Sequence, residues 1–303
     1  MSGLVEREFS RSAGKAGRCW HAAAQAPPAG EAGGREAARR GRRIARSDRG
    51  GLPPGLISAA AVGAVLGLWA LIAALGIVPE LFVPSPASVW RAFLATLITG
   101  YRGSTLLGHL GMSLARVLGG FVLAVVTAVP LGLLMGRKPA VQAALDPLVE
   151  FYRPLPPLAY YTLLIVWLGI GDASKIALLY LAAFPPLSIS AMSAVRGINP
   201  RRIESAQCLG ADGFSLFSRI IVPSCLPEIF TGLRVSIGFT YTTLVSSEIV
   251  AAANGIGWMV LDASRFLRTD VIFVSIIVMG LTGLLLDRAI RFIERRLIPW
   301  KGR

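Results

Sequence analysis

The residue types that commonly bind metals or act as nucleophiles are sparse in this chain of 303 residues. Its three cysteines and two histidines are Cys19, Cys208, Cys225, His21 and His109. The cysteines have no CxxC spacing, and the five residues match no four-ligand metal pattern. A GxxxxGKS or GxxxxGKT phosphate-binding loop is also absent, since the one Gly-Lys pair, Gly14-Lys15, lacks the rest of the motif. We therefore predict no catalytic residues, no bound metal and no site of ATP hydrolysis on this chain.

A hydrophilic segment between two apolar stretches, residues 196–228, has the spacing of a helix, a turn and a second helix. Ser205 and Ala206 are small enough to let another surface approach closely. Gly210 suits the left-handed conformation that ends a helix, and Pro223 suits the start of the next one. An ordinary hairpin between two apolar helices is an equally good interpretation on the residues alone.

Three ionisable residues lie within or at the edge of apolar stretches, namely Arg116, Arg234 and Glu248. Arg234 and Glu248 are 14 positions apart, close to four helical turns, so they share a helix face but lie about 21 Å apart and cannot pair. Charged side chains in a membrane usually face a cavity or the interior of a helix bundle. Arg234 and Glu248 could therefore line a pathway or have interior partners, whereas Arg116 is expected to extend to the membrane interface.

Two further prolines, Pro156 and Pro157, follow Pro154 at the entrance of an apolar stretch. Proline fixes the backbone φ angle, so the run predicts a stiff elbow, stabilised by ion pairs among the charged residues just before it. A hinge or gate built on Pro156 and Pro157 is the second interpretation.

Small residues recur every four positions in one apolar stretch, at Gly120, Ala124, Ala128, Gly132 and Gly136. Such a stripe lets another helix approach closely. We expect that helix to belong to this chain, with a helix of a second subunit as the alternative.

All these residues are carried by a strongly apolar chain. Hydrophobic residues make up 54% and charged residues 16%, whereas soluble domains have roughly 25% charged residues. A helix needs roughly 20 apolar residues to cross the hydrocarbon core of a bilayer. Six such spans are expected, over Ile57–Val78, Val117–Gly136, Pro154–Gly171, Ile176–Val195, Ile229–Ala253 and Val271–Leu286. The predicted fold class is an all-α membrane protein with six transmembrane helices.

The distribution of basic residues predicts the orientation of these spans. Six spans place both ends of the chain on one side of the membrane. That side, formed by residues 1–54, 137–153, 196–228 and 287–303, carries 24 Lys and Arg residues, against five on the opposite side. Because cytoplasmic loops are enriched in these residues, we predict that both termini are cytoplasmic.

Two regions of the chain differ in composition. Residues 1–54 are rich in Arg, Gly and Ala and carry a net charge of +6. They are expected to form a basic, disordered cytoplasmic tail that contacts anionic lipid rather than nucleic acid. Residues 55–303 are expected to form one transmembrane domain, with residues 196–228 as its cytoplasmic loop.

The hydrophilic loop resembles the EAA loop of permease subunits from binding-protein-dependent ABC importers. The matching positions are Glu204, Ala206, Gly210, Ile220 and Pro223, with Ser205 in place of an Ala and Val222 in place of a Leu. Residues 145–159, 167–175, 227–235 and 246–257 resemble the nitrate/sulfonate/taurine group of these permeases, and most of all its taurine-transporting members. The resemblance extends from about residue 55 to the C-terminus.

This resemblance implies a type I ABC importer permease fold, crossing a bacterial inner membrane several times. Two permease subunits, expected to be identical, would form the pore, with two ATP-binding subunits beneath it and a periplasmic substrate-binding protein above. ATP and magnesium would be bound by the partner ATPase, so this chain would be no enzyme and need no cofactor. The EAA-like residues would form a coupling helix in a groove of the ATPase, with Glu204 capping or pinning that helix.

The implied cargo is taurine or a related aliphatic sulfonate, an anion that Arg234 could attract. Nitrate, bicarbonate or a heterocyclic precursor remain open, because specificity in such importers resides mostly in the binding protein. A self-sufficient secondary transporter is the alternative from another class. It predicts inverted repeats and coupling-ion carboxylates near the midplane, where Glu248 alone is found.

Overall fold

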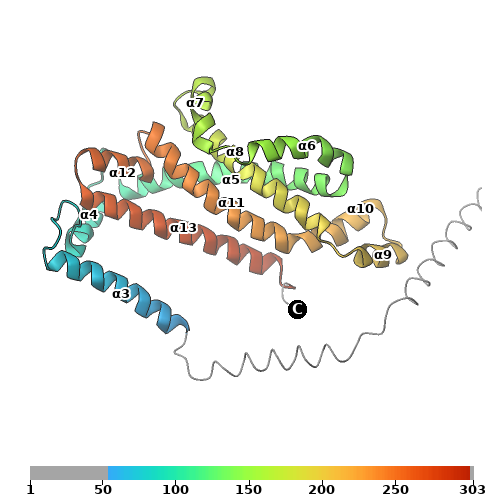
Figure 1. Ribbon diagram of the computed structural model, residues 1–303, viewed down its shortest axis with the longest axis horizontal. Coiled ribbons are helices and arrows are strands. Elements are labelled where there is room, and N and C mark those ends of the chain that lie inside the picture. Colours follow the sequence, from blue (N-terminus) through green and yellow to red (C-terminus); the bar gives the residue numbers. More distant parts are fainter. Residues whose placement is uncertain (1–53, 301–303) are drawn as a thin grey trace, which may run out of the picture. The chain divides into compact units, whose positions relative to one another are not determined.

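The computed structural model of the chain describes residues 54–300 (Figure 1). Within that range the chain is almost entirely helical, and its one extended pairing is an isolated bridge between Tyr101 and Ser104. The helices are α3 Pro54–Ala74, α4 Pro86–Ile98, α5 Leu106–Arg137, α6 Pro139–Tyr152, α7 Pro157–Leu168, α8 Asp172–Arg196, α9 Pro200–Cys208, α10 Gly213–Leu216, the π-helix η1 Phe217–Ile221, α11 Val222–Ala251, α12 Ile256–Arg265 and α13 Thr269–Leu297. The predicted basic tail falls outside the described residues, apart from Pro54 at the start of α3.

Contacts divide the described chain into two units. The smaller unit contains α3 as far as Leu71 and the residues Glu204–Asp212. The larger unit contains Ile72–Ile203 and the chain from Gly213 onward. The buried ion pairs and the helix bundle described below all belong to the larger unit.

Five helical segments of the described chain have the length and apolar composition to cross a membrane: Gly55–Ala74, Leu106–Arg137, Asp172–Arg196, Gly213–Ala251 and Thr269–Leu297. Five of the six expected spans lie on these segments. The other, expected over Pro154–Gly171, is α7, which has 12 residues. Helix α7 begins only after the proline run, and it ends at Gly169, whose φ angle of 82° is left-handed. Proline and glycine therefore shorten this apolar segment at both ends.

The core of the larger unit lies between α5, α8 and α11, which run alongside one another in Figure 1. Its buried apolar side chains come from all three helices: Val117, Phe121, Ala124, Ala128, Leu179, Ala183, Leu187, Ile237 and Leu244. Because each helix is long enough to cross the membrane, this core is the interior of a helix bundle.

The small-residue stripe of α5 is the surface on which α8 packs. A Cβ atom at Gly120 would lie 2.6 Å from Leu179 Cβ, and one at Gly136 would lie 2.6 Å from Val195 Cβ. At Gly132 it would collide with the carbonyl oxygen of Ser188. The stripe therefore serves packing within this chain's own bundle, as expected.

Candidate functional site

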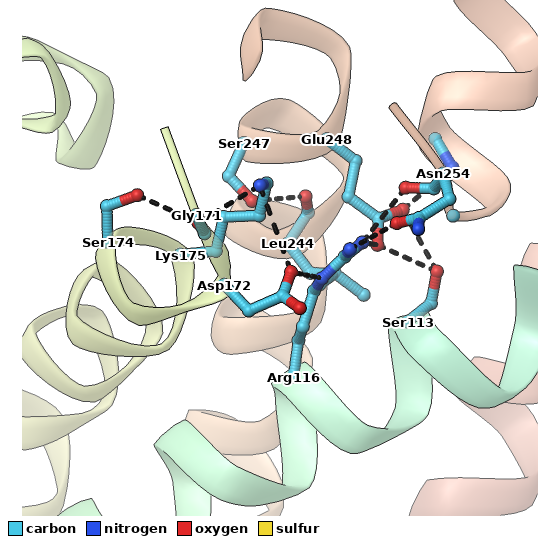
Figure 2. A network of polar contacts seen from close by, with 12 residues as sticks. Ser113, Arg116, Gly171, Asp172, Ser174, Lys175, Leu244, Ser247, Glu248 and Asn254 are labelled. Atoms are coloured by element: carbon cyan, nitrogen blue, oxygen red, sulfur yellow. Dashed lines mark hydrogen bonds and ion pairs between the residues drawn. The ribbon is translucent and has the colours of Figure 1, made fainter. Parts of the chain in front are cut away.

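A polar network, largely buried but exposed at Asp172, surrounds Arg116 of α5 (Figure 2). Its Nε donates to Oδ1 of Asp172 on α8 at 2.8 Å, and its Nη1 donates to Oε1 of Glu248 on α11 at 2.8 Å. Nη1 also donates to the backbone oxygen of Asn254 at 2.9 Å, and Nη2 donates to Oδ1 of the same residue. Only 3% of Arg116 is exposed, so its planar guanidinium joins three helices and one loop in the interior.

Glu248 is fully buried and has further donors on both carboxylate oxygens. Ser113 Oγ donates to Oε1 and Oε2 at 2.8 and 3.0 Å, and the backbone N–H of Gly257 donates to Oε2 at 2.9 Å. Ser113 Oγ in turn accepts from the backbone N–H of Ile256 at 3.0 Å. These donors give both carboxylate oxygens hydrogen-bond partners, which offsets the cost of removing the group from water.

Two glycines allow the loop after α11 to close around this carboxylate. Gly255 has a φ angle of 116°, and a Cβ atom there would lie 2.5 Å from Glu248 Cδ. At Gly257 a Cβ atom would lie 2.9 Å from the carbonyl oxygen of Val245. Side chains at these two positions would therefore displace the loop from Glu248.

Asp172 and Lys175 complete the charges of the network at the start of α8 (Figure 2). Lys175 is buried, and its Nζ donates to the carbonyl oxygen of Gly171 at 3.1 Å and lies 3.9 Å from Asp172 Oδ1. The network thus holds two cations, Arg116 and Lys175, and two anions, Asp172 and Glu248. This balance suits a cluster of charges at the edge of a low-dielectric membrane interior. We call Ser113, Arg116, Asp172, Lys175, Glu248 and Asn254 the Arg116 network.

His109 extends the polar contacts one turn along α5. Its Nδ1 accepts the backbone N–H of Gly255 at 3.1 Å, so the ring proton of the neutral imidazole is on Nε2, which donates to the carbonyl oxygen of Tyr101 at 3.1 Å. The hydroxyl of Tyr101 donates to Oδ2 of Asp262 on α12 at 2.8 Å. Burial and the Asp262 carboxylate raise the pKa of Tyr101 to about 12, so the hydroxyl stays a donor at neutral pH.

Arg234 has a partner of its own near the middle of α11, about four helical turns from Glu248. Its Nε donates to Oδ1 of Asp287 on α13 at 2.9 Å, and its side chain is 35% exposed. Arg234 and Glu248 are thus bound to different helices, in agreement with the spacing that prevents a direct pair. Their expected role in lining a pathway stays a prediction.

The proline run forms the connection between α6 and α7. Pro156 is the N-cap of α7 in an extended conformation, with φ and ψ of −64° and 129°, and Pro157 is the first residue of the helix. Both prolines suit these positions, because neither has an N–H that the helix would need. The elbow is therefore present, and its action as a hinge or gate stays a prediction. The expected ion pairs are wrong for the described residues, because Asp146, Glu150 and Arg153 form no ion pair with one another.

The EAA-like segment has the expected order of a helix, a turn and a second helical element. Helix α9 ends in a Schellman motif, in which the N–H of Ala211 donates to Ala206 O at 2.9 Å and that of Gly210 donates to Gln207 O at 3.0 Å. Gly210 has a φ angle of 86°. Further along the chain Ile220 lies in the π-helix η1, and Val222 and Pro223 begin α11.

The family follows from comparison with known proteins. Residues 128–299 match the family described as the binding-protein-dependent transport system inner membrane component, which is more than half of the chain. The chain belongs to this family. It is therefore a permease subunit of an ABC importer, a pore component rather than an enzyme, and a multi-pass protein of the inner membrane.

Curated relatives agree with this assignment. The permease is 41% identical over 247 residues to the taurine transport system permease protein TauC of Escherichia coli, covering 81% of this chain and 90% of TauC. It is 32% identical to the putative aliphatic sulfonates transport permease protein SsuC of Bacillus subtilis, covering 78% of this chain and 85% of SsuC. It is 31% identical to the bicarbonate transport system permease protein CmpB of Synechocystis, covering 77% of this chain and 85% of CmpB. The resemblance to the nitrate/sulfonate/taurine group is confirmed.

A solved structure supports the fold. The permease matches a chain of the MetNI methionine ABC transporter, in an inward-facing conformation, with a TM-score of 0.56 and 17% identity. The match covers 63% of the permease and 95% of that chain. At this identity the likeness shows the fold alone, and it confirms the helical type I ABC importer permease fold.

One residue behaves differently from its sequence interpretation. Arg116 was expected to extend to the membrane interface, and this is wrong, because its side chain is buried and bound to Asp172, Glu248 and Asn254. In the sequence, the pair of Arg116 and Glu248 is indicated by two opposite charges near the ends of apolar stretches. The Asn-Gly-Ile-Gly turn that follows Glu248 is a second signal, since its glycines allow close approach of a buried group.

Proposed function

We propose that the permease imports taurine or a related aliphatic sulfonate into the cytoplasm, driven by ATP that a separate subunit hydrolyses. The observation that carries this proposal is the 41% identity to TauC over 90% of its length. The relationship to SsuC supports a sulfonate as the chemical class. The family description names a binding-protein-dependent system, which does not fit the alternative of a self-sufficient secondary transporter.

Bicarbonate is the second candidate cargo, because CmpB is also a relative, at 31% identity. Nitrate and a heterocyclic precursor belong to the same group of alternatives. A binding protein selects the cargo in such a system, so the permease sequence alone favours the sulfonate only through the higher identity to TauC.

The working assembly that we propose has two copies of this permease, two ATP-binding subunits carrying ATP and magnesium, and one periplasmic substrate-binding protein. Both termini are cytoplasmic in this proposal. The excess of Lys and Arg on that side, 24 against five, supports the orientation. The segment 204–223 then lies on the same side as the ATPase.

The coupling segment in this assembly comprises Glu204, Ser205, Ala206, Gly210, Ile220, Val222 and Pro223. Support comes from the Schellman turn at Gly210, which gives α9 a defined end, and from Leu209, whose apolar side chain is 89% exposed at that turn. In a groove of a partner protein this side chain would be removed from water, which favours binding. Glu204 pins this helix and takes no part in proton transfer.

Coupling is mechanical in this proposal. Closure of the ATPase dimer moves the two coupling segments as rigid bodies, and the bundles change between two arrangements. The elbow at Pro156 and Pro157 acts as a hinge in that change. The Arg116 network, whose acids and bases are mutually bonded, holds α5, α8 and α11 together as one moving body. In this proposal Arg234 and Glu248 mainly hold helices together, each through its own ion pair, and any contact with the cargo is secondary.

Reconstitution tests the proposal. The permease is purified with its ATPase and placed in liposomes, and uptake of labelled taurine, an alkanesulfonate, nitrate and bicarbonate is measured with the cognate binding protein outside and ATP inside. We expect uptake of taurine or the alkanesulfonate that requires ATP and the binding protein. Uptake of bicarbonate or nitrate alone would assign the other cargo, and uptake without ATP would contradict the coupling to an ATPase.

A further inference from the structure

A basic hollow lies between α11 and α13. Its volume is about 380 Å³, and it is lined by Arg234, Arg291, Glu294, Arg295, Ile298 and Pro299. The two helices contact each other, and the hollow lies at the C-terminal end of α13. No residue of the Arg116 network or of the coupling segment lines it.

The hollow carries an excess of positive charge. The carboxylate of Asp287 is shared, because Arg234 Nε donates to Oδ1 at 2.9 Å and Arg291 Nη2 donates to Oδ2. Arg295 forms no ion pair with any carboxylate of residues 54–300. With Glu294 as the second acid, the three arginines and two carboxylates among residues 54–300 leave one net positive charge. A singly charged anion would neutralise it.

The length of α13 places the hollow at the level of lipid headgroups. The helix has 29 residues, whereas roughly 20 cross the hydrocarbon core, so its last turns extend beyond the core. Apolar side chains on these turns are exposed beside the arginines, with Phe292 at 60%, Ile293 at 48% and Leu297 at 54%. A surface that alternates arginine with exposed apolar side chains is typical of a membrane interface.

We propose that this hollow binds the phosphodiester of an anionic phospholipid. Arginine forks bind phosphate oxygens through paired N–H donors, and basic pockets between membrane helices bind anionic headgroups. The single negative charge of a phosphatidylglycerol headgroup equals the excess charge of the hollow. Leu284 precedes Arg291 by two helical turns on the same face of α13 and is 52% exposed, so it lies where an acyl chain of such a lipid would run toward the hydrocarbon core.

A soluble anion has the same chemistry at its charged end, since inorganic phosphate and a sulfonate also bind arginine. Exposed apolar side chains favour the lipid, because a small hydrophilic anion gains nothing from them. An experiment must distinguish a phospholipid headgroup from a soluble anion. The binding measurement below does so without measuring transport, so its result is independent of the import proposal.

The test uses the permease in complex with its ATPase, in nanodiscs of phosphatidylcholine with a minor fraction of phosphatidylglycerol. Native mass spectrometry counts the phosphatidylglycerol that remains bound. The variant Arg291→Gln with Arg295→Gln removes two lining charges and leaves Arg234 to pair with Asp287. The matched control, Arg288→Gln with Arg296→Gln, removes two charges of the same helix that do not line the hollow.

We expect the lining variant to retain about tenfold less phosphatidylglycerol and the control variant to match the parent. If both variants lost phosphatidylglycerol equally, the lipid would be held by general surface charge rather than by the hollow. If the lining variant retained as much as the parent, the hollow would not be a lipid site. Either result would overturn the proposal. In nanodiscs of phosphatidylcholine alone, inorganic phosphate or taurine is titrated at millimolar concentration. Binding that depends on Arg291 and Arg295, and that displaces phosphatidylglycerol in the mixed nanodiscs, would assign the hollow to soluble anions and overturn the proposal.

Discussion

The guanidinium of Arg116 on α5 donates to the carboxylate of Glu248 on α11 at 2.8 Å, although the two residues are 132 positions apart in the chain. Both side chains are almost completely buried, at 3% and 0% exposure. A buried pair of this kind costs much to separate, because the remaining charge has no water to solvate it. Its main effect is to fix two spanning helices and the loop at Asn254 in one arrangement.

Removal of one partner of this pair is expected to destabilise the permease strongly. Arg116→Gln or Glu248→Gln should each lower the free energy of unfolding by about 3–5 kcal/mol. The double variant should lose at least about 1 kcal/mol less than the sum, since the lost interaction is shared. Denaturant titration of each purified variant in detergent measures its free energy of unfolding. Strictly additive losses would show that the two side chains do not interact.

Gly255→Ala is expected to loosen the loop that encloses Glu248. A Cβ atom there meets the carboxylate, and the φ angle of 116° is unfavourable for any residue but glycine. We expect a loss of about 1–3 kcal/mol in the free energy of unfolding. Gly238→Ala in α11 is the matched control, since nothing lies within 4 Å of its Cβ position. Equal behaviour of the two variants would contradict the proposed close contact.

Gly210→Val is expected to uncouple transport from ATP hydrolysis without preventing insertion. Nothing lies within 4 Å of a Cβ atom at Gly210, so the cost arises from the left-handed φ angle of 86°. It amounts to about 1–2 kcal/mol for a β-branched residue. Gly210→Asn serves as control, because asparagine tolerates this conformation. ATP-driven uptake in liposomes should fall severalfold for Val and stay near the parent value for Asn; similar uptake by both would exclude the turn from coupling.

Replacement of the two prolines of the proposed hinge, Pro156→Ala with Pro157→Ala, is expected to reduce uptake severalfold while the ATPase stays bound. Alanine at these positions leaves φ free and lets α7 extend backward. Pro86→Ala, at the first position of α4, is the matched control. Uptake should be measured together with ATP hydrolysis, and equal effects of both variants would assign the prolines to helix capping alone.

Deletion of residues 2–50 is expected to leave uptake unchanged. These residues lack any long apolar stretch, and the family match begins only at residue 128. Uptake and the amount of permease in the membrane are compared with those of the full chain. Loss of uptake at a normal membrane level would give the segment a role in transport.

The helical fold and the turn at Gly210 were predictable because their signals are local. Apolar runs of roughly 20 residues mark spanning helices, and the glycine at 210 marks the end of α9 through its own backbone conformation. The small-residue stripe is a similar case, since its period of four positions is visible within one helix and predicts a close neighbour.

Other features depend on tertiary contacts and could not be predicted. Arg116 at the edge of an apolar run is typical of a residue that extends to the interface. Its burial depends on Glu248 and Asn254, which only folding brings close. The same applies to Asp287, whose contact with Arg234 depends on how α11 and α13 pack. The length of α7 was overestimated because hydropathy does not register the helix-ending geometry of Gly169.

The separation of Arg116 and Glu248 along the chain has a consequence for biosynthesis. The ribosome completes α5 before it has made Glu248, the buried acid that pairs with Arg116, and 132 further residues take about 7–26 s at typical elongation rates. Until then the guanidinium has at most Asp172, 56 positions along the chain, as an acid partner. A chain whose synthesis stops early therefore exposes a charge that the finished protein hides, which is a feature by which quality control can distinguish incomplete copies from complete ones.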